Sequence, residues 1–179
     1  PCTTDSCSAG QCVHSGACPP TGNVALDAAS VRTACAGAAG DSITLTGVPV
    51  GSQADRILVV TVGAEENNAD CNLSLASASA TYGGIVMSKA VNRVSNTSSW
   101  RTCNGIFYLL NPPAGTANVV INFPTTGNAS LIDNRHAGAF VLFNAAQQAP
   151  EVTATAGANA TTNPVNTAIT PLTGGGVVV

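Results

Sequence analysis

The chain has 179 residues, enough for one domain with a sizeable core and a short appendage, and 8% of them are charged, against about 25% in an ordinary soluble domain. Its formal net charge of −3 offers no basic surface for nucleic acid, and no apolar run reaches the roughly 18 residues of a membrane-spanning helix. The neutral composition, rich in hydroxyl and amide groups, is typical of a secreted module or of a subunit buried in an assembly.

Cysteines gather at the start of the chain. Five of the seven fall within the first 35 residues, and we expect them to form disulfides in an oxidising compartment: Cys2, Cys7, Cys12, Cys18 and Cys35. A zinc site is disfavoured because paired C-x₂-C units are absent and only His14 lies nearby. Residues 1–22 contain too few apolar side chains to bury a core, so we predict a disulfide-stapled segment there and a separate β-domain over residues 23–179.

From Asn23 onward, short β-type runs alternate with Gly, Pro, Asn and Ser. Residues 24–35 are compatible with a helix, but their alternation favours a strand; residues 42–48 alternate with period two. Residues 56–62 are continuous and β-branched, which predicts a central strand buried on both faces. Further strands are expected at residues 73–82, 85–91, 105–110, 118–123, 137–144 and 168–172, with residues 177–179 beginning another. This spacing predicts an all-β fold, an antiparallel β-sandwich.

The two remaining cysteines, Cys71 and Cys103, flank the central strands, and we predict that they pair with each other. Five cysteines are then left, an odd number. One of them must reach Cys71 or Cys103, a segment outside this sequence, or another subunit.

Aromatic residues are scarce, at 4% of the chain. Tyr82, followed by two glycines, reads as an anchor at a strand end, and residues 111–115 (Asn-Pro-Pro-Ala-Gly) read as a sharp corner. The alternative is that Tyr82, Trp100 and Tyr108 form a platform for stacking sugars. We favour core or corner anchors, since large aromatics are mostly buried when they are few.

Two stretches resemble known families. Cys-Thr-Thr-Asp-Ser-Cys at residues 2–7, with Gly-Gln-Cys-Val-His at 10–14, resembles the end of a cysteine repeat of extracellular matrix proteins, among them slime-mould prestalk proteins and bacterial surface proteins. Tyr-Gly-Gly at 82–84 and Tyr-Leu-Leu-Asn-Pro-Pro-Ala-Gly-Thr at 108–116 resemble a jelly-roll-like module of large secreted bacterial proteins. The second resemblance implies a structural or adhesive repeat without a known active site. It also implies a further strand beyond residue 179, so that the chain is truncated at its C-terminus.

Catalytic and metal-binding patterns are weak. No G-x-S-x-G context accompanies His136, which we read as an exposed loop histidine. Glu65, Glu66 and Asp70 are the best Ca²⁺ candidates, yet they lack the order of a known calcium loop, and a solvated turn is favoured. The two glutamates are adjacent on a strand and so point to opposite sides, which disfavours a glycosidase pair. We therefore predict no catalytic residues and no cofactor other than a structural calcium ion.

Four sequons mark candidate glycosylation sites: Asn72, Asn96, Asn128 and Asn159. Together these features predict a non-enzymatic structural protein, extracellular or at the cell surface. It would be a building block of an assembly or filament held by β-strand pairing and disulfides. The alternative is an adhesive β-sandwich that binds carbohydrate or a cell surface within a larger protein. The expected partners are copies of itself, other domains of a larger surface protein, or glycans, without nucleic acid or a membrane span.

Overall fold

The computed structural model describes residues 4–8, 11–15, 22–37, 40–67, 76–96, 100–123, 132–156, 167–170 and 177–179. All the elements in these ranges are β-strands. Adjacent strands in every sheet pair in the antiparallel sense. The prediction of an all-β fold built from antiparallel sheets is therefore confirmed.

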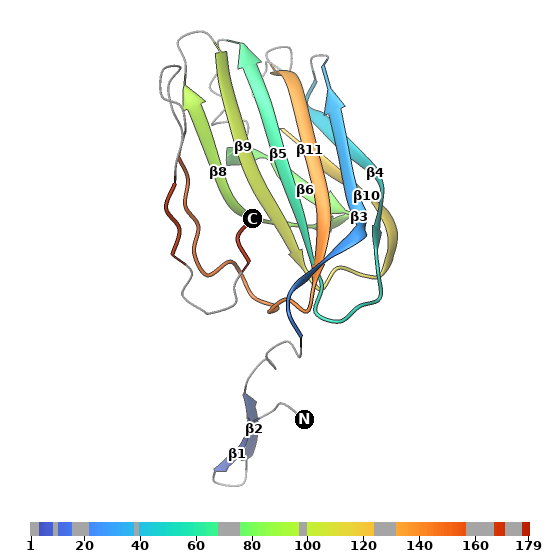
Figure 1. Cartoon of the computed structure of the whole chain (residues 1–179), viewed down its shortest axis with the longest axis vertical. Coiled ribbons are helices and arrows are strands. Elements are labelled where there is room, and N and C mark those ends of the chain that lie inside the picture. The colour runs from blue at the N-terminus through green and yellow to red at the C-terminus, as the bar shows by residue number, and fades with distance from the viewer. Residues whose placement is uncertain are drawn as a thin grey trace.

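The strands form two larger sheets and a separate hairpin (Figure 1). The five-stranded sheet contains, in spatial order, β3 (Ala25–Ala36), β11 (Ile132–Phe143), β5 (Ile57–Asn67), β9 (Trp100–Leu110) and β8 (Ser88–Asn96). The four-stranded sheet contains β4 (Ser42–Val50), β10 (Gly115–Asn122), β6 (Ser79–Tyr82) and β7 (Ile85–Val86). The hairpin pairs β1 (Thr4–Ser8) with β2 (Gln11–Ser15), and its register places Cys7 opposite Cys12.

The hydrophobic core lies between the two larger sheets. Successive side chains on a strand point to opposite faces, so every second residue of a strand points toward the core. The four-stranded sheet contributes Leu45, Val48, Tyr82, Val119 and Ile121, and the five-stranded sheet contributes Leu58, Val60, Phe107, Ile132 and Val141. Each large apolar side chain buried in this way stabilises the fold by about 1.5–3 kcal/mol.

Strand β5 is the central strand of the five-stranded sheet, as its β-branched sequence predicted. Its inner side chains, among them Val60 at 0% exposure, pack in the core. On the opposite face Val59 is also buried, at 5% exposure. The strand is thus covered on both faces, which explains why its sequence is continuously apolar rather than alternating.

The Asn-Pro-Pro corner between β9 and β10 is held by Arg56 at the start of β5. The Arg56 guanidinium donates to the carbonyl oxygen of Pro112 through Nε at 3.2 Å and through Nη2 at 3.1 Å. Asn111 adopts a left-handed conformation, with φ 45°, and its amide donates to the Arg56 carbonyl oxygen at 2.8 Å. This local geometry reverses the chain between the two sheets, as the sequence predicted.

The outer edges of both sheets carry features that oppose pairing with another strand. In β3, residues 28–31 bulge opposite Phe140, and Ser30 fills the bulge by accepting the Val141 amide at 2.7 Å. The β4 edge contains Pro49, and β7 is only two residues long. The β8 edge carries the cationic Lys89 and Arg93. Bulges, prolines, short strands and charges are the usual means by which sheet edges avoid aggregation.

Some expected elements differ from the structure. The expected strand 85–91 divides at Met87, a buried residue, into β7 and β8, which belong to different sheets. Residues 168–170 and 177–179 are not in strands, so these predictions were wrong there. Residues 73–75 and 171–172 lie outside the described residues. The helical alternative for residues 24–35 is excluded by β3.

Candidate functional site on the outer face of the five-stranded sheet

The outer face of the five-stranded sheet is the surface opposite the core, and the C-terminal region of the chain crosses it. Its composition changes along the strands. Apolar residues such as Ile57, Val59 and Tyr108 occupy one half, and polar residues such as Asn104 and His136 occupy the other. Both halves are hollowed, which makes this face the candidate site.

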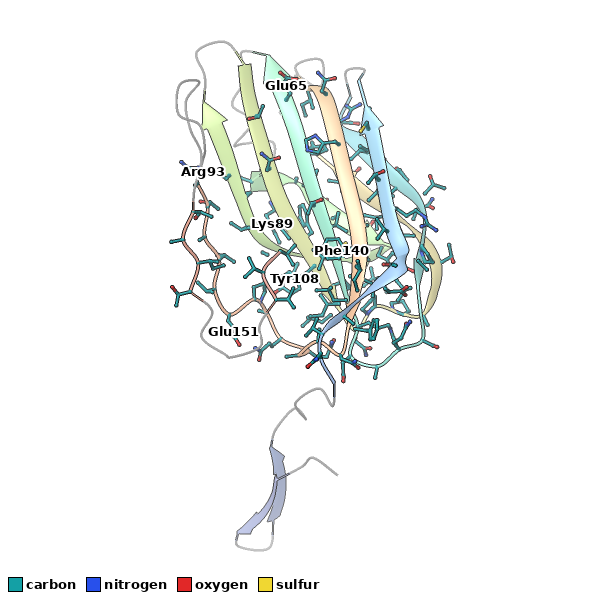
Figure 2. All side chains as sticks on the ribbon, in the orientation of Figure 1. Glu65, Lys89, Arg93, Tyr108, Phe140 and Glu151 are labelled. Atoms are coloured by element: carbon teal, nitrogen blue, oxygen red, sulfur yellow. The ribbon has the colours of Figure 1, made fainter. Side chains whose placement is uncertain are left out.

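The apolar half is a groove of about 280 Å³ between the sheet and the C-terminal region. Ile57, Val59, Ile106, Tyr108 and Leu142 form its floor. Its other wall consists of residues 149–154, Ile169 and residues 177–179. Figure 2 shows Tyr108 and Phe140 on this side of the sheet, with the segment around Glu151 beside it. The terminal valines thus contact the fold without joining a sheet.

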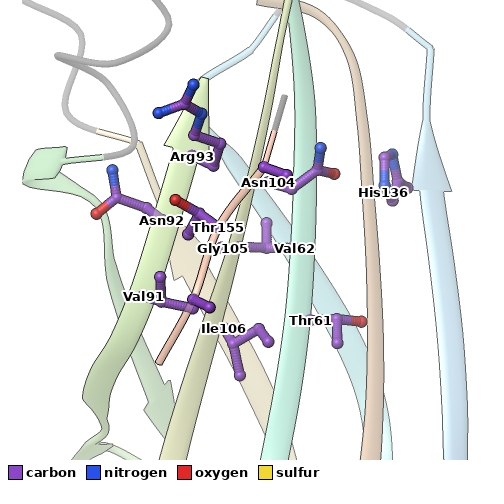
Figure 3. A pocket seen from close by; sticks show the side chains of 12 residues that line it. Thr61, Val62, Val91, Asn92, Arg93, Asn104, Gly105, Ile106, His136 and Thr155 are labelled. Carbon is purple, nitrogen blue, oxygen red and sulfur yellow. The ribbon is translucent and has the colours of Figure 1, made fainter. Parts of the chain in front are cut away.

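The polar half is a second cavity, of about 320 Å³ (Figure 3). The strand register aligns one residue from each strand across the sheet: Cys35, His136, Gly63, Asn104 and Arg93. We call this set the polar row. Thr155 adds a further polar group to the cavity wall, and Val91 and Ile106 add apolar ones.

Gly63 sits at the centre of the polar row because its neighbours occupy the space above it. A Cβ atom at this position would lie 2.1 Å from both Cε1 and Nε2 of His136, and 2.8 Å from Oδ1 of Asn104. The imidazole and the amide therefore converge over the glycine from the strands on either side. This close approach requires a residue without a side chain.

The polar side chains of this cavity differ from other polar side chains of the protein in their hydrogen bonding. Within the described part of the chain, no hydrogen bond or ion pair engages the side chains of Asn92, Arg93, Asn104, His136 or Thr155. By contrast, Thr61 at the cavity edge donates to the Gly138 carbonyl oxygen at 3.4 Å, and Asn134 donates to Glu65 Oε2 at 2.9 Å. The cavity thus groups polar atoms that are available to a ligand.

The expectation for His136 needs correction. It lies in strand β11 rather than in a loop, because β11 begins at Ile132. The side chain is exposed, as expected, but it faces the cavity. The alternation of buried Arg135, Ala137 and Ala139 with exposed His136 is the sequence signal that could have placed it on the outer face.

The calcium candidates are not brought together by the described structure. Glu65 lies on the outer face and accepts the Asn134 hydrogen bond, whereas the Glu66 side chain and all of Asp70 lie outside the described residues. Among the residues that the structure describes, no group of three His, Cys, Asp or Glu side chains could hold a metal ion. The structural calcium ion stays a prediction. No helix in those same ranges is long and apolar enough to cross a membrane.

The two described cysteine side chains differ in state. Cys103 is buried on β9 and disulfide-bonded, with its partner outside the described residues. Cys35 is free and exposed on β3, which differs from the expectation of a disulfide there. The two cannot pair, because they lie on opposite faces and three strand spacings apart, about 14 Å at roughly 4.8 Å per spacing. The predicted pairing of Cys71 with Cys103, and the disulfides of Cys2, Cys7, Cys12 and Cys18, stay predictions.

Of the remaining predicted residues, some are described by the structure and others are not. Tyr82 is 1% exposed and donates to the carbonyl oxygens of Val48 and Gly115, so its role as a core anchor is confirmed. Tyr108 is partly buried in the apolar groove, and the Trp100 side chain lies outside the described residues.

Of the sequons, Asn96 ends β8, without a described side chain. The other three fall outside the described ranges: Asn72, Asn128 and Asn159.

Comparison with family models, with curated proteins and with solved structures found no significant match to this chain. The geometry of the outer face is therefore the basis on which a function can be proposed.

Proposed function

We propose that the protein is a non-enzymatic building block of an extracellular assembly, in which the C-terminal segment of one copy packs on the outer face of the next. The observation that carries this proposal is the apolar groove. Val177, Val178 and Val179 line it, yet they remain 52%, 59% and 53% exposed and join no strand.

An exposed apolar segment of this kind favours exchange between copies. A neighbouring molecule offers the same groove, so the contacts that residues 177–179 make within one chain form equally well between two chains. Three consecutive glycines at residues 174–176 precede the valines in the sequence and permit many backbone paths. Adding a neighbour's segment would cover apolar area that a single copy leaves in water.

The features of the sheet edges support residues 177–179 as the point of contact. The bulge in β3, Pro49 in β4, the short β7 and the charges on β8 all oppose edge-to-edge pairing. Residues 177–179 contain no charge or proline that would oppose pairing. Assembly through this segment is therefore favoured over growth by continuous sheets.

The architecture that we propose for the subunit is a jelly-roll sandwich. Its support is a nested pairing of strands: β3 pairs with β11, β4 with β10, β5 with β9 and β6 with β7. The segment that contains β7 and β8 takes the place of one strand and is shared between the sheets. Folding a long hairpin over on itself in this way produces the two Greek keys of a jelly roll.

The test is to delete residues 174–179 and to compare the product with a triple variant in which Val177, Val178 and Val179 become Thr. Threonine keeps the shape of valine but makes packing into an apolar groove less favourable. We expect both variants to elute as folded monomers under conditions where the parent chain forms larger species, as measured by light scattering and electron microscopy. Persistence of the larger species, or unfolding of the monomer, would overturn the proposal.

A further inference from the structure

The polar cavity on the outer face has a charge character opposite to that of the whole chain. Among the described residues that line it, Arg93 is a cation and none is Asp or Glu. The chain as a whole has a net charge of −3. A concave site lined by a cation without carboxylates attracts anions, because the field of the cation is not cancelled locally.

Arg93 gives the site its specificity for a particular kind of anion. It is exposed at the β8 end of the polar row, and within the described residues its guanidinium has no hydrogen-bond or ion-pair partner. By contrast, Arg32 and Arg56 donate to backbone carbonyl oxygens. A planar guanidinium with free donors matches a carboxylate through two parallel hydrogen bonds.

The neighbouring groups match hydroxyl groups rather than further charge. The side-chain amide of Asn104 and the hydroxyl of Thr155 each both donate and accept hydrogen bonds. Val91 and Ile106 supply an apolar surface beside them. Ring hydroxyls beside an apolar sugar face need this combination of amphoteric side chains and aliphatic contacts.

The length of the polar row indicates a ligand larger than a small organic acid. Arg93 on β8 and His136 on β11 are separated by three strand spacings, about 14 Å between backbones. The volume of about 320 Å³ falls at the lower end of the range of small-molecule sites, roughly 300–1,000 Å³.

We propose that this cavity binds a carboxylate-bearing sugar, with a uronate carboxylate on Arg93 and ring hydroxyls on Asn104 and His136. Gly63 allows His136 and Asn104 to converge at the centre of the row, so it is a positioning residue for both. This inference goes beyond the proposed assembly and does not depend on it. The C-terminal valines line the apolar groove and not the polar cavity.

Among the described residues, one acidic side chain lies close enough to oppose an anion. Glu65 is on the same face of β5 as Gly63, two residues further along. Its carboxylate accepts a hydrogen bond from Asn134, which holds it at the end of the face beyond the polar row. The Glu65→Gln variant should therefore bind the acidic sugar more tightly, by up to about threefold, since the interaction is exposed and screened.

The experiment uses digalacturonate and its methyl ester as probes. The two sugars share every hydroxyl, and only the first carries carboxylates. We expect calorimetric titration of the full chain to show binding of the acid at least tenfold tighter than binding of the ester, weakening as salt is added. In the amide region of a ¹⁵N-labelled sample, the side-chain amide of Asn104 should shift on addition of the acid, which requires no variant.

Two matched pairs of variants locate the site. Arg93→Gln should lower the affinity for digalacturonate at least tenfold and remove the preference over the ester. Arg32→Gln, which removes the same charge from β3 outside the cavity, should change it by less than about twofold. Asn104→Ala should weaken binding, whereas Asn122→Ala on the exposed part of β10 should not. Thermal unfolding of each variant verifies that it is folded.

Three outcomes would overturn the proposal. Equal binding of the acid and the ester would remove the role of the carboxylate. Acetate or citrate binding as tightly as digalacturonate would show a general anion site without sugar recognition. An absence of binding at millimolar concentrations in the folded protein would remove the site altogether. None of these outcomes affects the assembly of the chain, which is measured separately.

Discussion

The two faces of the five-stranded sheet are built from the same strands but differ in their surroundings. The inner face packs in the core, and the outer face carries the groove and the cavity. The inner face is mostly aliphatic and buried, with Val60 and Val141 at 0% exposure. The outer face combines a partly covered apolar groove with a polar cavity, where the side chains of Arg93, Asn104 and His136 have no hydrogen-bond or ion-pair partner within the described residues. Neighbouring residues on one strand therefore belong to two environments.

Because of this difference, we expect substitutions on the inner face to change stability and substitutions on the outer face to change binding. Burial on the inner face is complete, so almost any loss of volume there must weaken the fold. On the outer face a side chain can change with little effect on folding but with a direct effect on what the surface binds. Substituting two adjacent residues of one strand, one on each face, tests this expectation, because both variants alter the same strand.

The largest contrast is expected on β9, between Phe107 on the inner face and Tyr108 on the outer face. Phe107 is 1% exposed, and Phe107→Ala should lower the free energy of unfolding by about 3–5 kcal/mol, because it leaves a cavity in the core. Tyr108→Ala should lower it by about 1 kcal/mol. Urea denaturation of both variants provides the measurement. Equal losses would show that the two faces are equally important for folding.

The next largest effect concerns the disulfide of Cys103, which lies on the inner face beside the core. Replacing Cys103 with Ala should lower the free energy of unfolding by about 2–4 kcal/mol in the oxidised protein. If Cys71 is the partner, Cys71→Ala and the double variant should show the same loss as the single variant.

A matched control for this experiment is Cys35→Ser on the outer face. Cys35 is exposed and free, so its replacement should change stability by no more than about 0.5 kcal/mol. Peptide mapping that joined Cys103 to any cysteine other than Cys71 would refute the predicted pairing.

The inner face was largely predictable from the sequence, because buried strand positions require apolar residues in a regular pattern. The alternation in residues 42–48 and the continuous β-branched run in residues 56–62 placed β4 and β5 correctly. The Asn-Pro-Pro corner followed from the fixed φ of proline and its missing donor. Each of these signals is local, so neighbouring residues suffice to read it.

The outer face could not be predicted in the same way, because its features depend on residues far apart in the chain. The polar row joins His136 to Gly63 and Arg93 across four strands, and only the register brings them together. The contact of Val177 with the groove likewise depends on the path of the whole C-terminal region. Local sequence had placed His136 in a loop and the valines in a strand.

A smaller effect is expected from Tyr82, which joins the four-stranded sheet to the core. Its hydroxyl shares its one proton between the carbonyl oxygens of Val48 and Gly115, both at 3.3 Å. Tyr82→Phe should lower the free energy of unfolding by about 1 kcal/mol at neutral pH, since it removes these bonds and keeps the ring. Thermal unfolding monitored by circular dichroism measures the change.

The same residue gives a dependence on alkaline pH. Burial raises the pKa of Tyr82 above its ordinary value, so above about pH 10 the unfolded chain loses this proton before the folded protein does. The folded state then binds more protons, and the contribution of Tyr82 to stability declines as the pH rises through this range. Tyr82→Phe should make the alkaline decline shallower. An unchanged slope would contradict the assignment.

The smallest effect on stability, and the most informative for the outer face, is expected from Gly63→Ala. The added methyl group would meet the His136 ring at 2.1 Å, but this ring belongs to an exposed side chain that can rotate away. The free energy of unfolding should therefore change by less than about 1 kcal/mol. The ring resonances of His136 should shift, because the imidazole can no longer lie over β5. Gly138→Ala is the control, since its Cβ would meet Thr61 Oγ1 at 3.1 Å in the neighbouring row and not the imidazole. A loss above about 2 kcal/mol for Gly63→Ala would mean that the His136 ring is held as firmly as a core side chain. The outer face would then contribute to stability as the inner face does, contrary to the difference expected between them.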